Sequence, residues 1–289
     1  MIAFSYEYVK PKTIVEALEI LNSEDEVYPI LGGTDLIVKM RAGRLKPKIV
    51  VDLKGIDELF KIEFSRDKGL TIGAGITLNS LVEDFDYIKE YFPTLYEGVK
   101  VVGGYQTRNR GTIVGNICNA SPASDTAPAL LTYNAKVNIV SLKGERTVDI
   151  NEFFLGPGKT VLQKGEIVRS ITVPYESDNI GKYYKISRTK AIDLATIGVA
   201  LTVIEPNGKR EIRVALASVA PTPLRVYEAE EFIKGKELTK ENVERFAQIV
   251  QNSVTPITDA RGTAEYRRKM AKVLPIKLLR EMNLCKGEF

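Results

Sequence analysis

The first residues of interest form a glycine turn suited to phosphate. In Pro29-Ile30-Leu31-Gly32-Gly33-Thr34-Asp35-Leu36, an apolar strand runs into two glycines and then into the expected start of a helix. Glycines let a ligand approach the backbone, and free amide groups at a helix start face an anion. The alternative is an ordinary strand-to-helix turn that Thr34 or Asp35 caps. The carboxylate of Asp35 favours this alternative, because a carboxylate repels a phosphate.

A second segment, from Arg110 to Asp125, concentrates glycine, asparagine, serine and threonine, with few bulky apolar side chains. Such a stretch gains too little apolar burial to order itself, but it suits a hydroxylated and phosphorylated ligand. Asn116 and Asn119 both donate and accept hydrogen bonds, and Asp125 accepts them from hydroxyl groups. The alternative is a solvated loop rich in turn residues.

A third candidate is the basic stretch from Lys185 to Leu194, which includes Arg188, Lys190 and Asp193. Lys185 could stabilise negative charge on a bound cofactor, and the loop after it could gate access to that cofactor. An ordinary solvated hairpin explains the same residues, and the pattern alone favours it slightly.

The composition excludes several classes of function. Histidine is absent and there are two cysteines, Cys118 and Cys285, so a metal site on this chain and Ser-His-Asp or Cys-His catalysis lack their ligands or base. Cys118 is interpreted as a packing residue. Redox chemistry would therefore need an organic cofactor. A net charge of +4 with interspersed signs argues against nucleic-acid binding. The sequence has no apolar run of the ~18 residues that a membrane helix needs and no recognisable signal peptide, so we expect a cytoplasmic protein.

Hydrophobic periodicity predicts the elements that position these residues. Thr13 begins a capping box, and Ile14, Ala17, Leu18 and Leu21 follow at helical intervals. Strands are expected at 27–31, 48–53, 61–64, 69–73, 136–142 and 146–150, helices at 34–41, from 77, at 93–102 and at 125–133, and an irregular stretch at 103–124. After a polar stretch near 174–181, strands at 182–187, 195–205 and 211–219, with a turn at 206–208, precede helices at 223–233, 239–253 and 263–282. This order is typical of an α+β protein.

Taken together, these segments make the chain resemble the FAD-binding medium subunit of the xanthine dehydrogenase and carbon monoxide dehydrogenase family, the molybdenum hydroxylases. The resemblance runs nearly end to end through Leu31 to Leu36, Thr71 to Gly75 with Thr77 and Leu81, Arg110 to Asp125, Ser187-Arg188 with Asp193 to Ala195, and Ala217 to Pro223. One residue departs from the family, which usually has two glycines at Val114-Gly115. A valine does not readily adopt a positive φ, but it keeps its N–H, so we expect the backbone contact to survive.

The resemblance implies an FAD-binding domain over residues 1–176 and a C-terminal α+β domain, an antiparallel sheet with helices, over residues 177–289. The first would be of the vanillyl-alcohol-oxidase-like, PCMH type, with α/β subdomains of about 1–55 and 56–176. By the same resemblance the FAD diphosphate lies at Gly32-Gly33-Thr34 and at Thr112 to Asn116, which include Val114 and Gly115. Asp125 would lie near the ribityl chain, Val168 near the flavin and adenine, and Lys185 near the ring. Val102 completes the predicted cofactor-binding set.

The implied function is electron transfer. A large molybdopterin subunit would oxidise the substrate, and a small subunit would carry the electrons through [2Fe–2S] clusters to the FAD of this chain. An external acceptor, which could be NAD, a quinone, ferredoxin or oxygen, would then take them. Two alternatives stay open: a stand-alone FAD-dependent oxidoreductase of related fold, which needs a substrate pocket with a proton donor, and a non-catalytic nucleotide-binding module.

Overall fold

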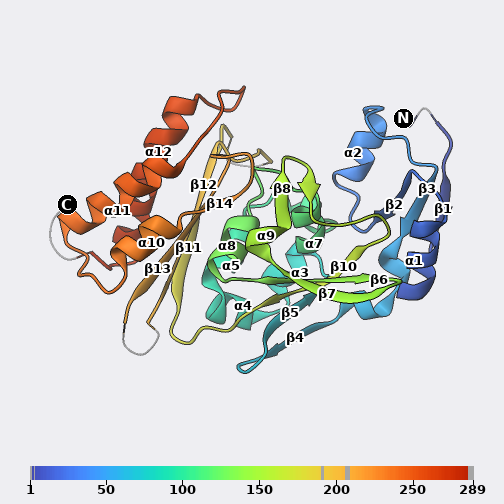
Figure 1. The fold of residues 1–289 in the computed structure, drawn as a ribbon, viewed down its shortest axis with the longest axis horizontal. Coiled ribbons are helices and arrows are strands. Elements are labelled where there is room, and N and C mark those ends of the chain that lie inside the picture. The colour runs from blue at the N-terminus through green and yellow to red at the C-terminus, as the bar shows by residue number, and fades with distance from the viewer. Residues whose placement is uncertain (1, 3, 190–191, 206–208, 286–289) are drawn as a thin grey trace.

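The computed structural model describes residues 2, 4–189, 192–205 and 209–285. Within them the strands form a three-stranded, a five-stranded, a four-stranded and a small two-stranded sheet. Figure 1 shows the three larger sheets following one another across the molecule in the order of the chain, with helices between and beside them. The predicted α+β class is therefore confirmed. None of the helices in the described ranges is long and apolar enough to cross a membrane.

The first sheet is parallel, with the strand order β1-β3-β2. Its elements are β1 (Glu7–Val9), α1 (Ile14–Ser23), β2 (Val27–Ile30), α2 (Leu36–Arg41) and β3 (Ile49–Asp52), followed by the 3-10 turns η1 (Leu53–Gly55) and η2 (Asp57–Phe60). Thr13 caps α1 by accepting a hydrogen bond from the Glu16 amide at 3.1 Å. Because parallel strands end on one edge, the turn after β2 and the residues after β3 lie on the same side of this sheet.

The second sheet is antiparallel, in the order β4-β5-β10-β6-β7. Its strands are β4 (Ile62–Ser65), β5 (Gly69–Gly73), β6 (Lys136–Ser141), β7 (Gly144–Asp149) and β10 (Ile167–Val173). The accompanying elements are α3 (Leu78–Glu83), α4 (Asp86–Tyr91), α5 (Pro93–Lys100), α6 (Tyr105–Arg108), α7 (Ile113–Cys118), α8 (Ala127–Thr132), α9 (Ile150–Phe153), β8 (Phe154–Gly156) and β9 (Lys159–Thr160). The central strand β10 was not among the predicted strands.

The segment 103–124 is less irregular than the sequence predicted, because it contains α6 and α7. Thr112 caps α7 by accepting a hydrogen bond from the Gly115 amide at 2.9 Å, and Ile113, Val114 and Ile117 are buried beneath the helix. Val114 lies inside this helix and is not among the residues with positive φ. The replacement of a family glycine by valine therefore causes no backbone strain here.

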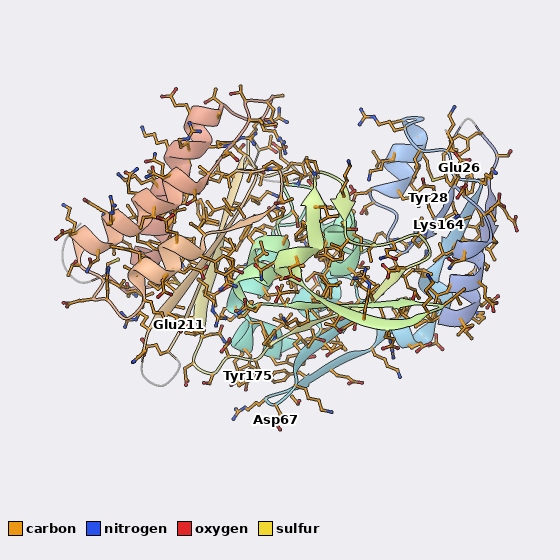
Figure 2. All side chains as sticks on the ribbon, viewed as in Figure 1. Glu26, Tyr28, Asp67, Lys164, Tyr175 and Glu211 are labelled. Atoms are coloured by element: carbon orange, nitrogen blue, oxygen red, sulfur yellow. The ribbon has the colours of Figure 1, made fainter. Side chains whose placement is uncertain are left out.

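The first two sheets share one hydrophobic core, which fixes their mutual placement. Buried residues of α1 and β3, such as Leu18 and Val51, belong to the same cluster as Leu70 and Ile72 of β5. An ion pair of 2.6 Å between Lys164 and Asp25 lies at this junction, where Figure 2 places Lys164 beside Glu26 and Tyr28. Both partners are largely exposed, so this pair contributes little stability. Apolar burial is the main force that holds the two subdomains together.

The third sheet is antiparallel and lies between two layers of helices. Its strands are β11 (Ile180–Ile186), β12 (Ile197–Ile204), β13 (Glu211–Ala217) and β14 (Leu224–Arg225), and its helices are α10 (Tyr227–Ile233), α11 (Lys240–Ser253) and α12 (Ala264–Glu281). Helices α5 and α8 pack on one side, and α10 and α12 pack on the other (Figure 1). Every residue of β12 is consequently buried. The predicted turn at residues 206–208 lies outside the described residues.

Candidate functional site

The two predicted phosphate-binding segments touch each other, although about eighty residues separate them. A Cβ atom on Gly32 would stand 2.0 Å from the carbonyl oxygen of Arg110 and 2.9 Å from the Cα of Gly111. Gly33 has a φ of +71°, in the left-handed region where a side chain is strained. The two turns therefore meet backbone to backbone, and position 32 has no room for a side chain. We name Gly32, Gly33, Thr34, Thr112 and Gly115 the turn cluster.

The Asp35 carboxylate faces a hydrogen-bond donor and a nearby positive charge. Asp35 occupies the N-cap position of α2 but makes no capping hydrogen bond with its side chain. Its carboxylate accepts a hydrogen bond from the Asn119 amide at 3.0 Å, and the Lys39 ammonium donates to the Asn119 oxygen at 2.8 Å. Asn119 thus links the two segments, and Lys39 brings positive charge to the Asp35 carboxylate. The repulsion that Asp35 would exert on a bound anion is accordingly reduced.

The backbone beside Gly115 is open to a ligand. Gly115 is exposed, and a Cβ atom there would meet only the Thr112 hydroxyl, at 3.2 Å. One residue later, Asn116 turns inward and accepts hydrogen bonds from the hydroxyl groups of Ser124 at 2.5 Å and Thr126 at 2.7 Å. These bonds hold the residues around Asp125 beside α7.

Asp125 and Lys185 form a buried ion pair between the second and third sheets. The Lys185 ammonium donates to Asp125 Oδ2 at 2.7 Å and to the carbonyl oxygen of Val101 at 3.1 Å, and the Tyr183 hydroxyl donates to Asp125 Oδ1 at 2.9 Å. The side chains of Lys185 and Asp125 are 9% and 5% exposed. Burial raises the pKa of Asp125, while Lys185 and Tyr183 oppose the rise. Val102 follows Val101 directly, and we name Val102, Asp125 and Lys185 the junction cluster.

The other predicted residues lie around these clusters. Pro29 and Ile30 end β2, Leu31 begins the turn, and Leu36 begins α2. A Cβ atom on Gly33 would stand 2.9 Å from the Cδ1 atom of Ile30, so the Ile30 side chain leaves no room for one. Val168 is buried in β10, the strand on which α7 packs.

In the predicted gating loop, the Arg188 guanidinium pairs with Asp193 at 3.3 Å. Arg188 also donates a hydrogen bond to the carbonyl oxygen of Ala260, at 3.4 Å. Arg188 is thus linked to the segment that precedes α12. Lys190 lies outside the described residues.

The sequence reasoning missed two residues that hold the site together. Tyr183 lies two residues before Lys185 on β11, and this spacing puts both side chains on one face of the strand. The alternation of side chains along a strand would therefore have identified Tyr183 as a neighbour of Lys185. Arg267, 2% exposed, donates to the Ser218 carbonyl at 2.9 Å, and the Ser218 amide donates to the Pro122 carbonyl at 2.7 Å. Nothing in the local sequence around Arg267 signals this connection to the loop before Asp125.

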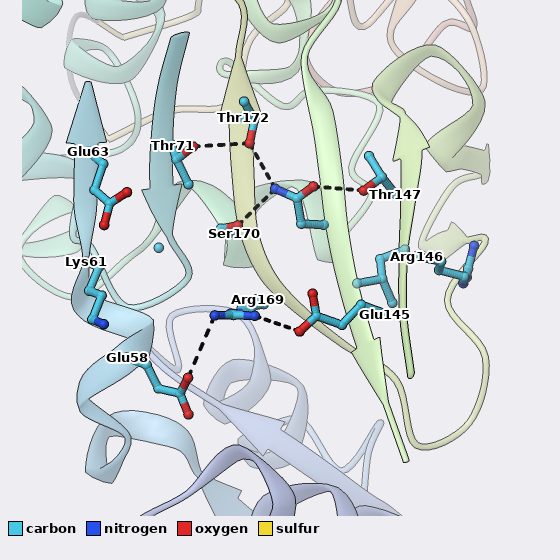
Figure 3. A pocket seen from close by; sticks show the side chains of 13 residues that line it. Glu58, Lys61, Glu63, Thr71, Glu145, Arg146, Thr147, Arg169, Ser170 and Thr172 are labelled. Atoms are coloured by element: carbon cyan, nitrogen blue, oxygen red, sulfur yellow. Dashed lines mark hydrogen bonds and ion pairs between the residues drawn. The ribbon is translucent and has the colours of Figure 1, made fainter. Parts of the chain in front are cut away.

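A hollow on the outer face of the five-stranded sheet contains none of the predicted residues (Figure 3). Several of its polar side chains bond to one another: Asn138 donates to Ser170 at 3.0 Å and to Thr172 at 2.9 Å. Figure 3 shows Arg169 between Glu58 and Glu145, which lie 3.9 Å and 2.7 Å from its guanidinium. Because none of the predicted residues lines this hollow, we assign no ligand to it.

The chain matches two known protein families. Residues 4–176 match the family described as the FAD binding domain in molybdopterin dehydrogenase. Residues 182–282 match the CO dehydrogenase flavoprotein C-terminal domain. The chain belongs to the FAD-binding medium subunits of the molybdenum hydroxylase family. It is therefore a flavoprotein and an oxidoreductase subunit.

Individual medium subunits resemble this chain over almost their whole length. The glyceraldehyde dehydrogenase medium chain of Sulfolobus acidocaldarius is 34% identical, over 96% of this chain and 98% of that protein. The xanthine dehydrogenase FAD-binding subunit of Escherichia coli O157:H7 is 31% identical, over 97% of each. A solved carbon monoxide dehydrogenase from Hydrogenophaga pseudoflava has a chain with a TM-score of 0.91 and 32% identity, which covers 97% of this chain and 98% of that one.

The groups present in this medium subunit fit FAD. The turn cluster offers the Gly32 and Gly33 amides and two threonine hydroxyls beside Gly115, which has no side chain and whose own amide is bonded to Thr112; this arrangement suits a diphosphate. The junction cluster offers a carboxylate and an ammonium group for the polar parts of the flavin moiety. Within the described ranges, no three His, Cys, Asp or Glu side chains gather as a metal site would require.

We expect the Cys118 thiol of this medium subunit to be unreactive in the native protein. The Cys118 side chain is half-buried, and the loss of solvent around its sulfur raises its pKa to about 12. At pH 8 only about one thiol in ten thousand would then be ionised, and the thiolate is the nucleophile. Iodoacetamide followed by mass spectrometry should find Cys118 unmodified in the native protein and modified in urea. Equal labelling in both conditions would contradict the raised pKa of this thiol.

Proposed function

We propose that this chain binds FAD with the turn cluster at the diphosphate and the junction cluster towards the flavin ring, and that it transfers electrons through this cofactor. The electrons would come from [2Fe–2S] clusters of a small subunit, which receives them from a molybdenum-binding large subunit. An external acceptor, such as NAD, a quinone, ferredoxin or oxygen, would take them. We further propose that residues 1–176 form the FAD-binding domain and that the complex works in the cytoplasm.

One observation carries the proposal: the turn at Gly32 and the turn at Arg110-Gly111 are in backbone contact. A diphosphate carries its negative charge on several oxygens, and the Gly32-Gly33 turn and the start of α7 can bind it from two sides. The Arg110 and Gly111 amides themselves are bonded to the Thr107 carbonyl. A single glycine turn would be weak support, because such turns are common connections between a strand and a helix.

In this proposal, the residues of the chain bind FAD and orient it. The hydroxyl groups of Thr34 and Thr112 lie in the same cluster as the glycine amides. Lys185, fixed by Asp125 and by the Val101 carbonyl, brings a positive charge to the junction of the two domains. When bound, FAD supplies the redox chemistry, because it accepts electrons singly and releases them singly or in pairs.

The names of the relatives support the partner assignment. A medium chain implies larger and smaller chains, and the matched relatives include a glyceraldehyde dehydrogenase and a xanthine dehydrogenase. The absence of histidine from the sequence, with only two cysteines, agrees with metal centres that reside on other chains.

Native purification from the source cells tests the proposal. We expect the chain to co-elute with two other subunits, with FAD equimolar to this chain and with molybdenum and iron in the same fractions, as flavin and metal analysis would measure. After addition of the substrate of the large subunit, the visible absorption band of the oxidised flavin should bleach within the complex.

Other results would select other functions. A chain that carries FAD, elutes alone and oxidises a substrate by itself would be a stand-alone flavoenzyme. A chain that elutes without FAD, and takes up none when FAD is added, would contradict the proposed function as a whole.

A further inference from the structure

Three side chains form a hydrogen-bonded group at the carboxyl edge of the parallel sheet. Asp52, the last residue of β3, is 1% exposed and lies opposite Ile30 of β2. Its Oδ2 accepts a hydrogen bond from the Tyr8 hydroxyl, and its Oδ1 accepts from the Lys54 ammonium at 2.5 Å and the Lys54 amide at 3.0 Å. The carboxylate is thus well satisfied and holds the lysine in one place.

The same ammonium group reaches the glycine turn. Lys54 Nζ donates a second hydrogen bond to the carbonyl oxygen of Leu31, at 3.1 Å. Leu31 directly precedes Gly32. With a side chain only 30% exposed, Lys54 lies between a buried carboxylate and this carbonyl rather than extending into solvent.

A held carbonyl fixes the amide that follows it. The peptide unit is planar and trans, so the oxygen of Leu31 and the N–H of Gly32 lie in one rigid plane and point in opposite directions within it. Lys54 holds the oxygen, and the carbonyl of Arg110 abuts Gly32 from the other segment. Gly32 is therefore confined from two directions by groups that the turn itself does not contain.

We propose that Lys54, anchored by Asp52 and Tyr8, is a positioning residue that sets the direction of the Gly32 amide for the diphosphate of the cofactor. This inference rests on the proposed function, since it assigns the diphosphate to the turn cluster. The Lys54 charge is balanced by Asp52, so its effect on the ligand comes through the geometry of the Leu31–Gly32 peptide.

The test compares ligands with and without a diphosphate on the full-length protein. In the Lys54→Met variant, we expect the affinity for FAD and for ADP to fall by about tenfold, the effect of losing one charge-assisted hydrogen bond. The affinity for riboflavin, which lacks the diphosphate, should stay as in the wild type. Lys54→Arg, which can donate to the same oxygens, should recover part of the loss. Flavin fluorescence and calorimetry measure these affinities.

Two further variants guard against a general structural effect. Lys48→Met removes another ion-paired lysine of the same subdomain, at the opposite end of β3, and should leave all affinities unchanged. If Lys54→Met fails to fold because Asp52 loses its partner, Asp52→Asn with Lys54→Met removes the uncompensated charge and should show the same loss for FAD and ADP.

Wild-type affinity for FAD in the folded Lys54 variants would overturn the positioning role and leave the proposed function intact. An equal loss for riboflavin and FAD would also overturn it, since that pattern reflects a disturbed protein. If the wild-type protein binds neither FAD nor ADP, the proposed function fails, and the positioning role fails with it.

Discussion

Substitution of Gly32 by alanine is expected to lower the affinity for FAD by about a hundredfold, because overpacking costs about 1–3 kcal/mol and here displaces the binding backbone itself. The added Cβ would stand 2.0 Å from the Arg110 carbonyl oxygen and 2.6 Å from its carbon. These are backbone atoms, so no side-chain rotation relieves the contact. The turn at Gly32 and the Arg110-Gly111 segment must move apart. Equilibrium titration of the apoprotein, followed by flavin fluorescence, measures the loss.

The matched control for this variant is Gly156→Ala. No atom lies within 4 Å of the position that its Cβ would take, and its φ is not in the left-handed region. Its FAD affinity should equal that of the wild type. If Gly32→Ala binds FAD as tightly as this control does, the contact between the two turns has no part in cofactor binding.

Local sequence patterns predicted the helices and strands that residues close in sequence determine. Helix α1 shows this most clearly: the residues predicted for its buried face, Ile14, Ala17, Leu18 and Leu21, are the ones that the structure buries. Its cap, Thr13, was also predicted. Capping and amphipathic periodicity act within a few residues, so a sequence displays them directly.

Tertiary packing explains what the sequence did not reveal. Helix α7 is six residues long and contains Gly115 and Asn116, so its intrinsic helix propensity is low. It exists because Thr112 caps it and because Ile113 and Ile117 are buried against the core. Strand β10 pairs with β5 and β6, which lie far from it in the chain, and such pairings have no local signature.

The site was predicted as separate segments, and the structure supplied the contacts between them. Neither the contact between Gly32 and Arg110 nor the pairing of Lys185 with Asp125 could be read from the residues in order. The assignment of individual residues to FAD remains a prediction, as does the domain boundary at residue 176. Contacts across long sequence separations depend on the whole fold, which one sequence does not display.

The second large effect is expected from Asp125→Ala. This change leaves the Lys185 ammonium buried with the Val101 carbonyl as its remaining partner and deprives the Tyr183 hydroxyl of its acceptor. Removing one member of a buried ion pair costs about 3–5 kcal/mol of unfolding free energy. Urea unfolding of the full chain without FAD should show a loss of this size, because the pair is formed between side chains of the protein itself.

A double-mutant cycle separates the pair from its parts. Lys185→Met alone should also destabilise the protein, since it leaves the Asp125 carboxylate with only Tyr183 as its donor. Asp125→Asn combined with Lys185→Met removes both charges, and we expect it to lose at least about 1 kcal/mol less than the sum of its two single changes, as coupled neighbours do. Strict additivity would mean that the two charges do not interact in solution. Lys185 would then be positioned by its contact with the Val101 carbonyl and not by Asp125. The proposal that Asp125 orients this lysine towards the flavin would be contradicted.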